Sequence, residues 1–226
     1  MPAVRVHEAT TMILITLLAR PEISSLGPGA LISLPGMLLR IWASGYPPRE
    51  EGLSIAGPYQ YVRHPHHLGT FLVLLGLCVA SRSIGVTVYM LLGVLFIFRA
   101  IFVEEGEWLS RKAGLRYREY RLWVPPFIPA LIPYRQDGVK EKFSFNYSMF
   151  HGRHRELNPC IALLMGYLLL YGFMKIPDPA LFQMVVAGAL TLAFIVVLFG
   201  RIRQKGTSWF NPVLSRRTQE KEAEST

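Results

Sequence analysis

The chain has 226 residues, of which 51% are hydrophobic and only 17% are charged, and its formal net charge is +9. This composition is too apolar for an average soluble domain, and the basic residues are spread over several loops, which argues against a nucleic-acid-binding element. We therefore interpret the sequence as an all-α, polytopic integral membrane protein with about six transmembrane helices and additional interfacial helices.

Six apolar runs could cross a bilayer, which takes roughly 20 residues per helix. They are residues 9–19, 26–43, 67–80, 84–103, 159–173 and 180–200, and the first, third and fifth are short for a span. Pro21 breaks the chain between the first two runs, which predicts a tight helical hairpin and not a signal peptide.

The distribution of basic residues predicts the topology. If all six runs cross, every lysine and arginine except Arg20, Arg82 and Lys175 falls on one side. Because basic loops stay in the cytoplasm, both termini and the loops between 40 and 63 and between 99 and 155 are expected there. Cys78 and Cys160 lie in or beside apolar runs, and we expect no disulfide between them.

Three regions are expected along the chain. Residues 1–56 form an N-terminal hairpin with its cytoplasmic loop, and residues 57–135 form a core that carries the polar motifs. Residues 136–226 form an interfacial segment, a last helical pair and a polar tail.

The core opens with residues 57–69, GPYQYVRHPHHLG. Proline suits the first helical turn, so Pro65 predicts that His64 is an N-cap and that a helix follows. The free N–H groups of that turn would face a polar or anionic ligand at the membrane surface. The alternative is that Tyr59, Tyr61 and Arg63 are an ordinary interfacial anchor.

The runs 67–80 and 84–103 are joined by only three residues, so they should pack as an antiparallel pair. Their cytoplasmic ends then bring the histidines close to Arg99, Glu104 and Glu105. Arg99 lies inside the end of an apolar helix, where it either snorkels to the interface or serves a site. The two glutamates either face water or, because a helix C-terminus disfavours carboxylates, have a cationic partner or ligand.

Two further segments follow this pair. Residues 107–120, EWLSRKAGLRYREY, are basic and aromatic and should lie along the membrane surface. Residues 123–129, WVPPFIP, should form an extended apolar flap, because their three prolines exclude a helix.

These motifs together resemble the isoprenylcysteine carboxyl methyltransferase family and the related phospholipid methyltransferases. The resemblance rests on GPYQYVRHPHHLG, EEGEWL, AGLRYREY and VPPFIP and covers roughly residues 39–129. It implies an integral membrane enzyme that uses S-adenosylmethionine as methyl donor on the cytosolic side. The expected partners are membrane lipid and a lipophilic or lipidated substrate, without nucleic acid or metal.

The resemblance also implies site residues. Glu105, and with it Glu104, would face the cofactor's ammonium group, and Arg99 and Glu105 are the expected catalytic residues. The cofactor pocket would be lined by Glu51, Gly52, Leu53, Ser54, Tyr59, His64, Pro65, His66 and His67.

The chain departs from the family pattern at three places. His67 stands where the family usually has tyrosine. Counting back from the later tyrosines puts the glutamate pair at Glu105 and Gly106, so both Glu104 and Glu105 are kept as candidates. The family's substrate-side arginine would fall at Ile101, which makes Arg99 a near match.

The resemblance implies a lipophilic, isoprenylcysteine-like carboxylate as the first choice of acceptor. The chemistry of methyl transfer is consistent with it, because a carboxylate is already ionised at pH 7 and needs only positioning, which an arginine can provide. An amine acceptor, as in an aminophospholipid, would need a base such as His64 or His67.

Two other functions compete with this one. A membrane metal oxygenase would use the clustered histidines, but the chain has only six in total. A non-enzymatic scaffold or carrier would explain the helices but not the clustered motifs.

Overall fold

A computed structural model describes residues 2–46, 53–135, 141–151, 155–176, 180–181 and 183–192, and the chain divides into two compact units, Met1–Pro179 and Ala180–Thr226. All regular structure among these residues is helical, which confirms the predicted all-α class. The first unit contains α1 (Pro2–Leu18), α2 (Ile23–Ser44), η1 (Gly57–Gln60), α3 (Pro65–Ser81), α4 (Ile84–Trp123), η2 (Tyr147–His151) and α5 (Leu157–Lys175). The second unit contributes a short helix over residues 183–192.

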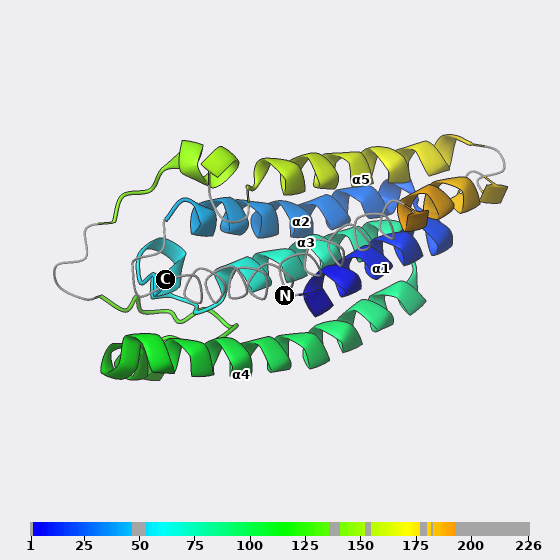
Figure 1. The fold of residues 1–226 in the computed structure, drawn as a ribbon. Helices are drawn as coiled ribbons and strands as arrows, with labels where there is room; N and C mark the ends of the chain where they lie inside the picture. The colour runs from blue at the N-terminus through cyan, green and yellow to red at the C-terminus, as the bar shows by residue number, and fades with distance from the viewer. Residues whose placement is uncertain are drawn as a thin grey trace, which may run out of the picture. The chain divides into compact units, whose positions relative to one another are not determined.

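Helices α2 and α3 form a close antiparallel pair at the centre of the first unit (Figure 1). A methyl group added to Gly36 would lie 2.7 Å from the carbonyl oxygen of Gly69, and one added to Gly29 would lie 2.6 Å from that of Gly76. Only glycine permits this approach of the two backbones, as at small-residue contacts between membrane helices. The two contacts fix the register: each step forward along α2 is a step back along α3.

The number of membrane crossings is only partly supported. Helices α2 and α5 are long and apolar enough to span a bilayer by length and composition. The remaining apolar helices found among the described residues are shorter: His7–Leu18, Pro65–Ser81, Ile84–Phe96 and Gln183–Leu192. The six crossings predicted from the sequence are therefore not confirmed.

Both predicted short connections between helices are present. Residues 19–22 separate α1 from α2 at Pro21, and Arg82 and Ser83 separate α3 from α4. Arg82 takes a left-handed conformation (φ 55°), and the Ser83 side chain caps α4 by accepting a hydrogen bond from the Val86 N–H. Cys78 and Cys160 are free thiols.

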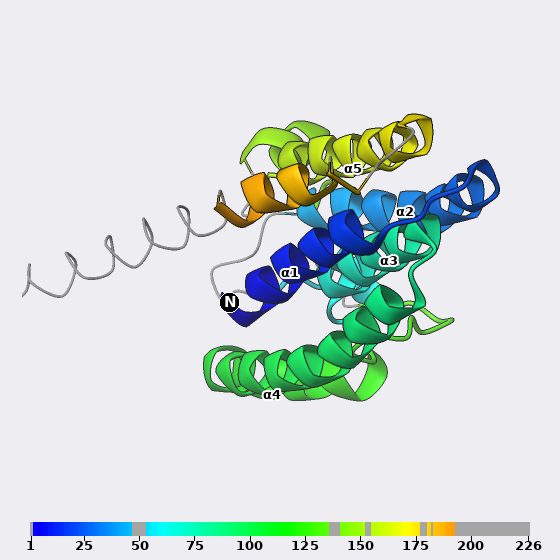
Figure 2. The same ribbon diagram turned by 90° about the vertical axis from the view of Figure 1, so that its right-hand side faces the viewer.

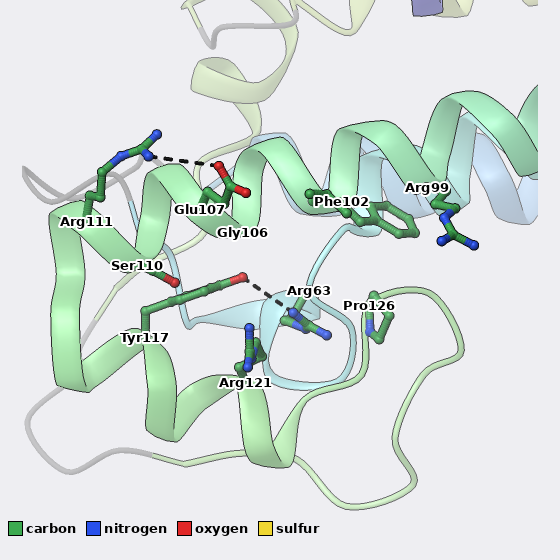
Figure 3. A pocket seen from close by; sticks show the side chains of 11 residues that line it. Arg63, Arg99, Phe102, Gly106, Glu107, Ser110, Arg111, Tyr117, Arg121 and Pro126 are labelled. Carbon is green, nitrogen blue, oxygen red and sulfur yellow. Dashed lines mark hydrogen bonds and ion pairs between the residues drawn. The ribbon is translucent and has the colours of Figure 1, made fainter.

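Helix α4 differs from the prediction, because it reverses direction. Its backbone is helical from Ile84 except at Gly114, where φ is 52° and ψ is −124°. That conformation is open to glycine and strained for other residues. The chain therefore folds back, so that the Tyr117 hydroxyl lies 3.4 Å from where a methyl group on Gly106 would be (Figure 3). Residues 107–120, predicted to lie along the membrane surface, are thus split between the two arms of a helical hairpin.

The segment after α4 is non-helical from Val124, one residue later than the start of the predicted extended flap. Figure 2 shows that α4 moves away from the α2–α3 pair along its length, toward the reversal at Gly114. Arg63 and residues of both arms of α4 line a cavity in this region.

Candidate active site

A cavity of roughly 620 Å³ lies between the two arms of α4 and the loop that precedes α3 (Figure 3). The loop contributes Arg63, and the segment after α4 contributes Pro126. The remaining lining residues come from the outgoing and returning arms of α4: Arg99, Phe102, Val103, Gly106, Glu107, Ser110, Arg111, Tyr117 and Arg121. A volume of this size is typical of small-molecule sites.

Proline at the first helical position sets the geometry of the loop. His64 is the N-cap residue of α3, as the sequence predicted, and Pro65 is the first residue of the helix. The backbone N–H groups of Arg63 and His64 donate to the carbonyl oxygens of Pro125 (2.9 Å) and Pro126 (3.3 Å). These bonds hold the loop against the segment that follows α4.

Two histidines pack around Phe102, a lining residue from the outgoing arm of α4, although neither belongs to the described lining of the cavity. The buried His64 ring stacks on Phe102 with centroids 4.4 Å apart and an interplanar angle of 12°. His67 lies on the same side, 6.3 Å from Phe102 and 5.9 Å from His64. The predicted proximity of these two histidines to the end of the α4 apolar run is therefore confirmed.

The described lining is strongly cationic. It contains four arginines and one carboxylate, Glu107, whose nearest contact to Arg111 is 3.9 Å. Arg63 Nη1 donates to the Tyr117 hydroxyl at 3.4 Å, while its buried Nε has no hydrogen-bond partner among the described residues. Such a guanidinium favours an anionic group within reach, because a buried donor without a partner is costly.

A cluster of buried apolar side chains packs the returning arm of α4 against the loop after α2. Tyr117, Tyr120 and Val124 pack there against Leu53 and Ile55 from the loop after α2. The Tyr120 hydroxyl donates to a backbone carbonyl oxygen in η1, that of Tyr59, at 2.7 Å. Burial raises the pKa of Tyr120 well above its ordinary value, so this phenol stays neutral.

Three of the loop residues predicted to bind cofactor make contacts near the cavity in the structure. Leu53 is buried in the cluster beneath Tyr117, and the Ser54 hydroxyl donates to Glu141 at 3.2 Å. Tyr59 supports Tyr120 through its backbone. Glu51 and Gly52 lie outside the described residues, as do the side chains of Glu104 and Glu105, so their predicted contacts with cofactor stay predictions.

His66 contacts different neighbours from His64 and His67. Its ring lies 3.5 Å from Glu156 and 3.3 Å from the Ser44 hydroxyl, and it does not line the cavity with Arg63. Adjacent helical positions face different sides, so His66 and His67 cannot share one wall.

Glu156 is the centre of a buried polar cluster. It has no exposed surface and accepts hydrogen bonds from Arg40 (2.9 and 3.3 Å) and from Ser44 (2.8 Å). Arg40 also donates to Thr70 of α3. The cluster thus joins α2, α3 and the start of α5 next to the loop that carries Arg63.

Several lining residues were missed by the sequence interpretation. Phe102 of the outgoing arm was not singled out, and Tyr117 and Arg121 reach the cavity only because the chain reverses at Gly114. The spacing of Tyr117 and Arg121, four residues apart on one helical face, was the available signal.

Residues 41–114 match the family model described as phospholipid methyltransferase, which confirms the resemblance indicated by the motifs. The chain is also 31% identical over 102 residues to the cobalt-zinc-cadmium resistance protein CzcN of Cupriavidus metallidurans. That alignment covers 44% of this chain and 47% of CzcN, so the chain spans about half the length of this curated relative. No solved structure matches the chain.

Proposed function

We propose that the protein is a membrane methyltransferase that uses S-adenosylmethionine and that the cavity between the arms of α4 is its active site. The observation that carries this proposal is the convergence of Arg63, Arg99 and Phe102 on one cavity, because all three belong to the stretch that matches the phospholipid methyltransferase family. Arg99 and Glu105 keep the catalytic roles that the resemblance implies.

The described lining is compatible with the cofactor. The faces of Phe102 and Tyr117 can accommodate a cationic sulfonium, and the buried Nε of Arg63 offers a donor to a carboxylate. When bound, S-adenosylmethionine supplies an activated methyl group on a positively charged sulfur. The cofactor's ammonium group would face Glu104 or Glu105, which follow Val103 of the lining along α4.

We assign the acceptor to the carboxylates, and specifically to a lipophilic, isoprenylcysteine-like acid. The carboxylate oxygen would attack the methyl carbon while the sulfur leaves as a neutral thioether, so no proton has to be removed. The task left to the chain is to hold the anion in line with the methyl group. Arg99 and Arg121, on opposite arms of α4, are placed to do this.

An amine acceptor is the second candidate within the same reaction class. The cluster of His64 and His67 favours it, since an imidazole could take the proton that an amine must lose. Against it stand the four arginines of the lining, which would repel a protonated amine.

The remaining parts of the proposal concern location and the alternatives. We propose a multi-pass arrangement with both termini and the site in the cytoplasm, supported by α2, α5 and the distribution of basic residues. The metal resistance in the name of CzcN is not carried over, because the described cavity lining offers one carboxylate and neither histidine nor cysteine. A scaffold or carrier without activity remains the alternative from another class.

The test is transfer of labelled methyl from S-adenosylmethionine into a lipid extract by the purified protein. A base-labile product identifies an ester and supports the carboxylate, whereas a base-stable product identifies a methylated amine and supports the second candidate. Absence of cofactor binding by calorimetry would favour the scaffold or carrier.

A further inference from the structure

An apolar segment borders the cavity and carries unusually exposed side chains. We call residues 125–133, PPFIPALIP, the lip. Backbone hydrogen bonds attach it to the loop before α3, with Arg63 donating to Pro125, His64 to Pro126 and Ala130 to Tyr61 (2.8 Å). The lip is therefore held in place and not a free strand of chain.

The side chains of the lip face two ways. Phe127 packs inward, 5.5 Å from the ring of Phe71 on α3 and 6.3 Å from that of Phe102 on α4. Ile128, Leu131 and Ile132 are instead 77%, 99% and 81% exposed. Three neighbouring aliphatic side chains exposed to this degree next to a cavity call for an apolar partner.

The register of α2 and α3 locates the lip along the proposed membrane span. Because Gly36 lies opposite Gly69, Phe71 lies beside the middle of α2 and not beyond its end. The ring of Phe127 rests on Phe71, while Ala130 bonds to Tyr61, whose ring is 6.4 Å from Trp42 near the end of α2. Phe127 thus lies level with the middle of α2, while Ala130 and the exposed residues that follow it lie near the level of Trp42, where the Tyr134 N–H also donates to Gln60 (2.9 Å).

This level is where a membrane interface would fall if α2 spans. Aromatic residues such as Trp42 and Tyr61 gather at the headgroup level, and the exposed aliphatic residues of the lip would then meet the outer part of the hydrocarbon. Four of the nine lip residues are prolines, which have no N–H to satisfy, so this irregular backbone is less costly near lipid. Arg135 follows the lip in sequence and would meet anionic headgroups.

We propose that the lip is a membrane-docking element, which inserts Ile128, Leu131 and Ile132 into the interface of an anionic bilayer beside the mouth of the cavity. The proposal rests on the membrane placement included in the proposed function. Because Pro126 lines the cavity, the lip is a wall shared by the cavity and the bilayer. A lipophilic acceptor could keep its chain in the membrane while its polar group enters the site.

The experiment places a fluorophore on the lip of the full-length protein. Cys78 and Cys160 are replaced by alanine, Leu131→Cys is labelled with an environment-sensitive dye, and the protein is reconstituted into phosphatidylcholine–phosphatidylglycerol vesicles. Nitroxide-labelled acyl chains should cause a loss of emission from this position, and aqueous iodide should cause little. Since Leu131 is fully exposed, its replacement removes no internal packing.

Two matched leucines serve as controls. Leu115 is 82% exposed but lies beside the Gly114 turn, at the far end of both arms of α4, so Leu115→Cys should be quenched by iodide and not by lipid nitroxide. Leu164 is 61% exposed within α5, so Leu164→Cys should be quenched by lipid nitroxide.

The outcomes distinguish failure of the lip proposal from failure of the membrane placement on which that proposal rests. Iodide quenching at residue 131 with lipid quenching at residue 164 would overturn the lip proposal alone. Iodide quenching at both would overturn the membrane placement as well. Protection of residue 131 from both quenchers would mean that protein, such as a second copy of the chain, covers the lip, and this also overturns the proposal.

Discussion

Replacing Glu156 by glutamine removes the only carboxylate in a buried cluster that contains the guanidinium of Arg40, among the described residues. The Glu156 side chain is fully buried and that of Arg40 is 14% exposed, so water can compensate little of the lost charge. Removing one partner of a buried ion pair costs about 3 to 5 kcal/mol. For a chain of this size, that corresponds to a fall in melting temperature of about 6 to 20 °C.

The assay is thermal unfolding of the detergent-solubilised full-length protein, and the structure provides a matched control. Glu22 pairs with Arg82 at the surface, where the two side chains are 60% and 46% exposed. Exposed pairs are worth about 0 to 1 kcal/mol, so Glu22→Gln should lower the melting temperature by no more than about 4 °C.

A double variant tests whether the cause is the unpaired charge. Adding Arg40→Met to Glu156→Gln removes the buried cation, so part of the lost stability should return, because a neutral pair avoids the desolvation penalty. If Glu156→Gln lowered the melting temperature no more than Glu22→Gln, the cluster would not be the buried, charge-paired element described above.

Other perturbations address the site and its support. His64→Ala removes the stack on Phe102 and should weaken S-adenosylmethionine binding in calorimetry by roughly 0.5 to 1.5 kcal/mol, about two- to tenfold. If the acceptor is a carboxylate, Arg99→Gln should lower the rate of methyl transfer to a lipid acid and leave the affinity for S-adenosylmethionine nearly unchanged. Full activity of the variant on such an acid would show that Arg99 only extends to the membrane interface. Gly114→Ala should cost about 1 to 3 kcal/mol of stability through backbone strain alone, since no atom lies within 4 Å of the added methyl group. Burial raises the pKa of Tyr120 in the folded protein above its value of about 10 in the unfolded chain. The contribution of neutral Tyr120 to stability is therefore complete below about pH 10 and declines at higher pH, where the unfolded chain ionises. Between about pH 10 and 11.5, the Tyr120→Phe variant should lose less stability than the parent chain, as measured by thermal unfolding at each pH.

Local sequence rules correctly predicted helix ends where a single residue determines the backbone conformation. Pro65 placed the N-cap of α3 at His64, and Pro21 placed the break between the first two helices. The reversal at Gly114 was not predicted, because a single glycine inside a helical pattern is usually tolerated and gives no direction. The position of His66 could not be predicted either, since its partner Glu156 lies 90 residues away in a segment without a recognised motif.

The loop that carries Arg63 and His64 is stabilised mainly by segments outside the stretch that matches the family. On one side, the lip accepts its backbone N–H groups at Pro125 and Pro126. On the other, the segment before α5 reaches the start of α3 through Glu156. The matched residues 41–114 therefore contain Arg63, His64 and the outgoing arm of α4, while the segments that follow them hold the loop in place. The proposed lipid-borne carboxylate therefore rests on two separate features of this chain: the arginines of the described cavity lining support an anion, and the exposed aliphatic residues of the lip support a substrate carried by lipid.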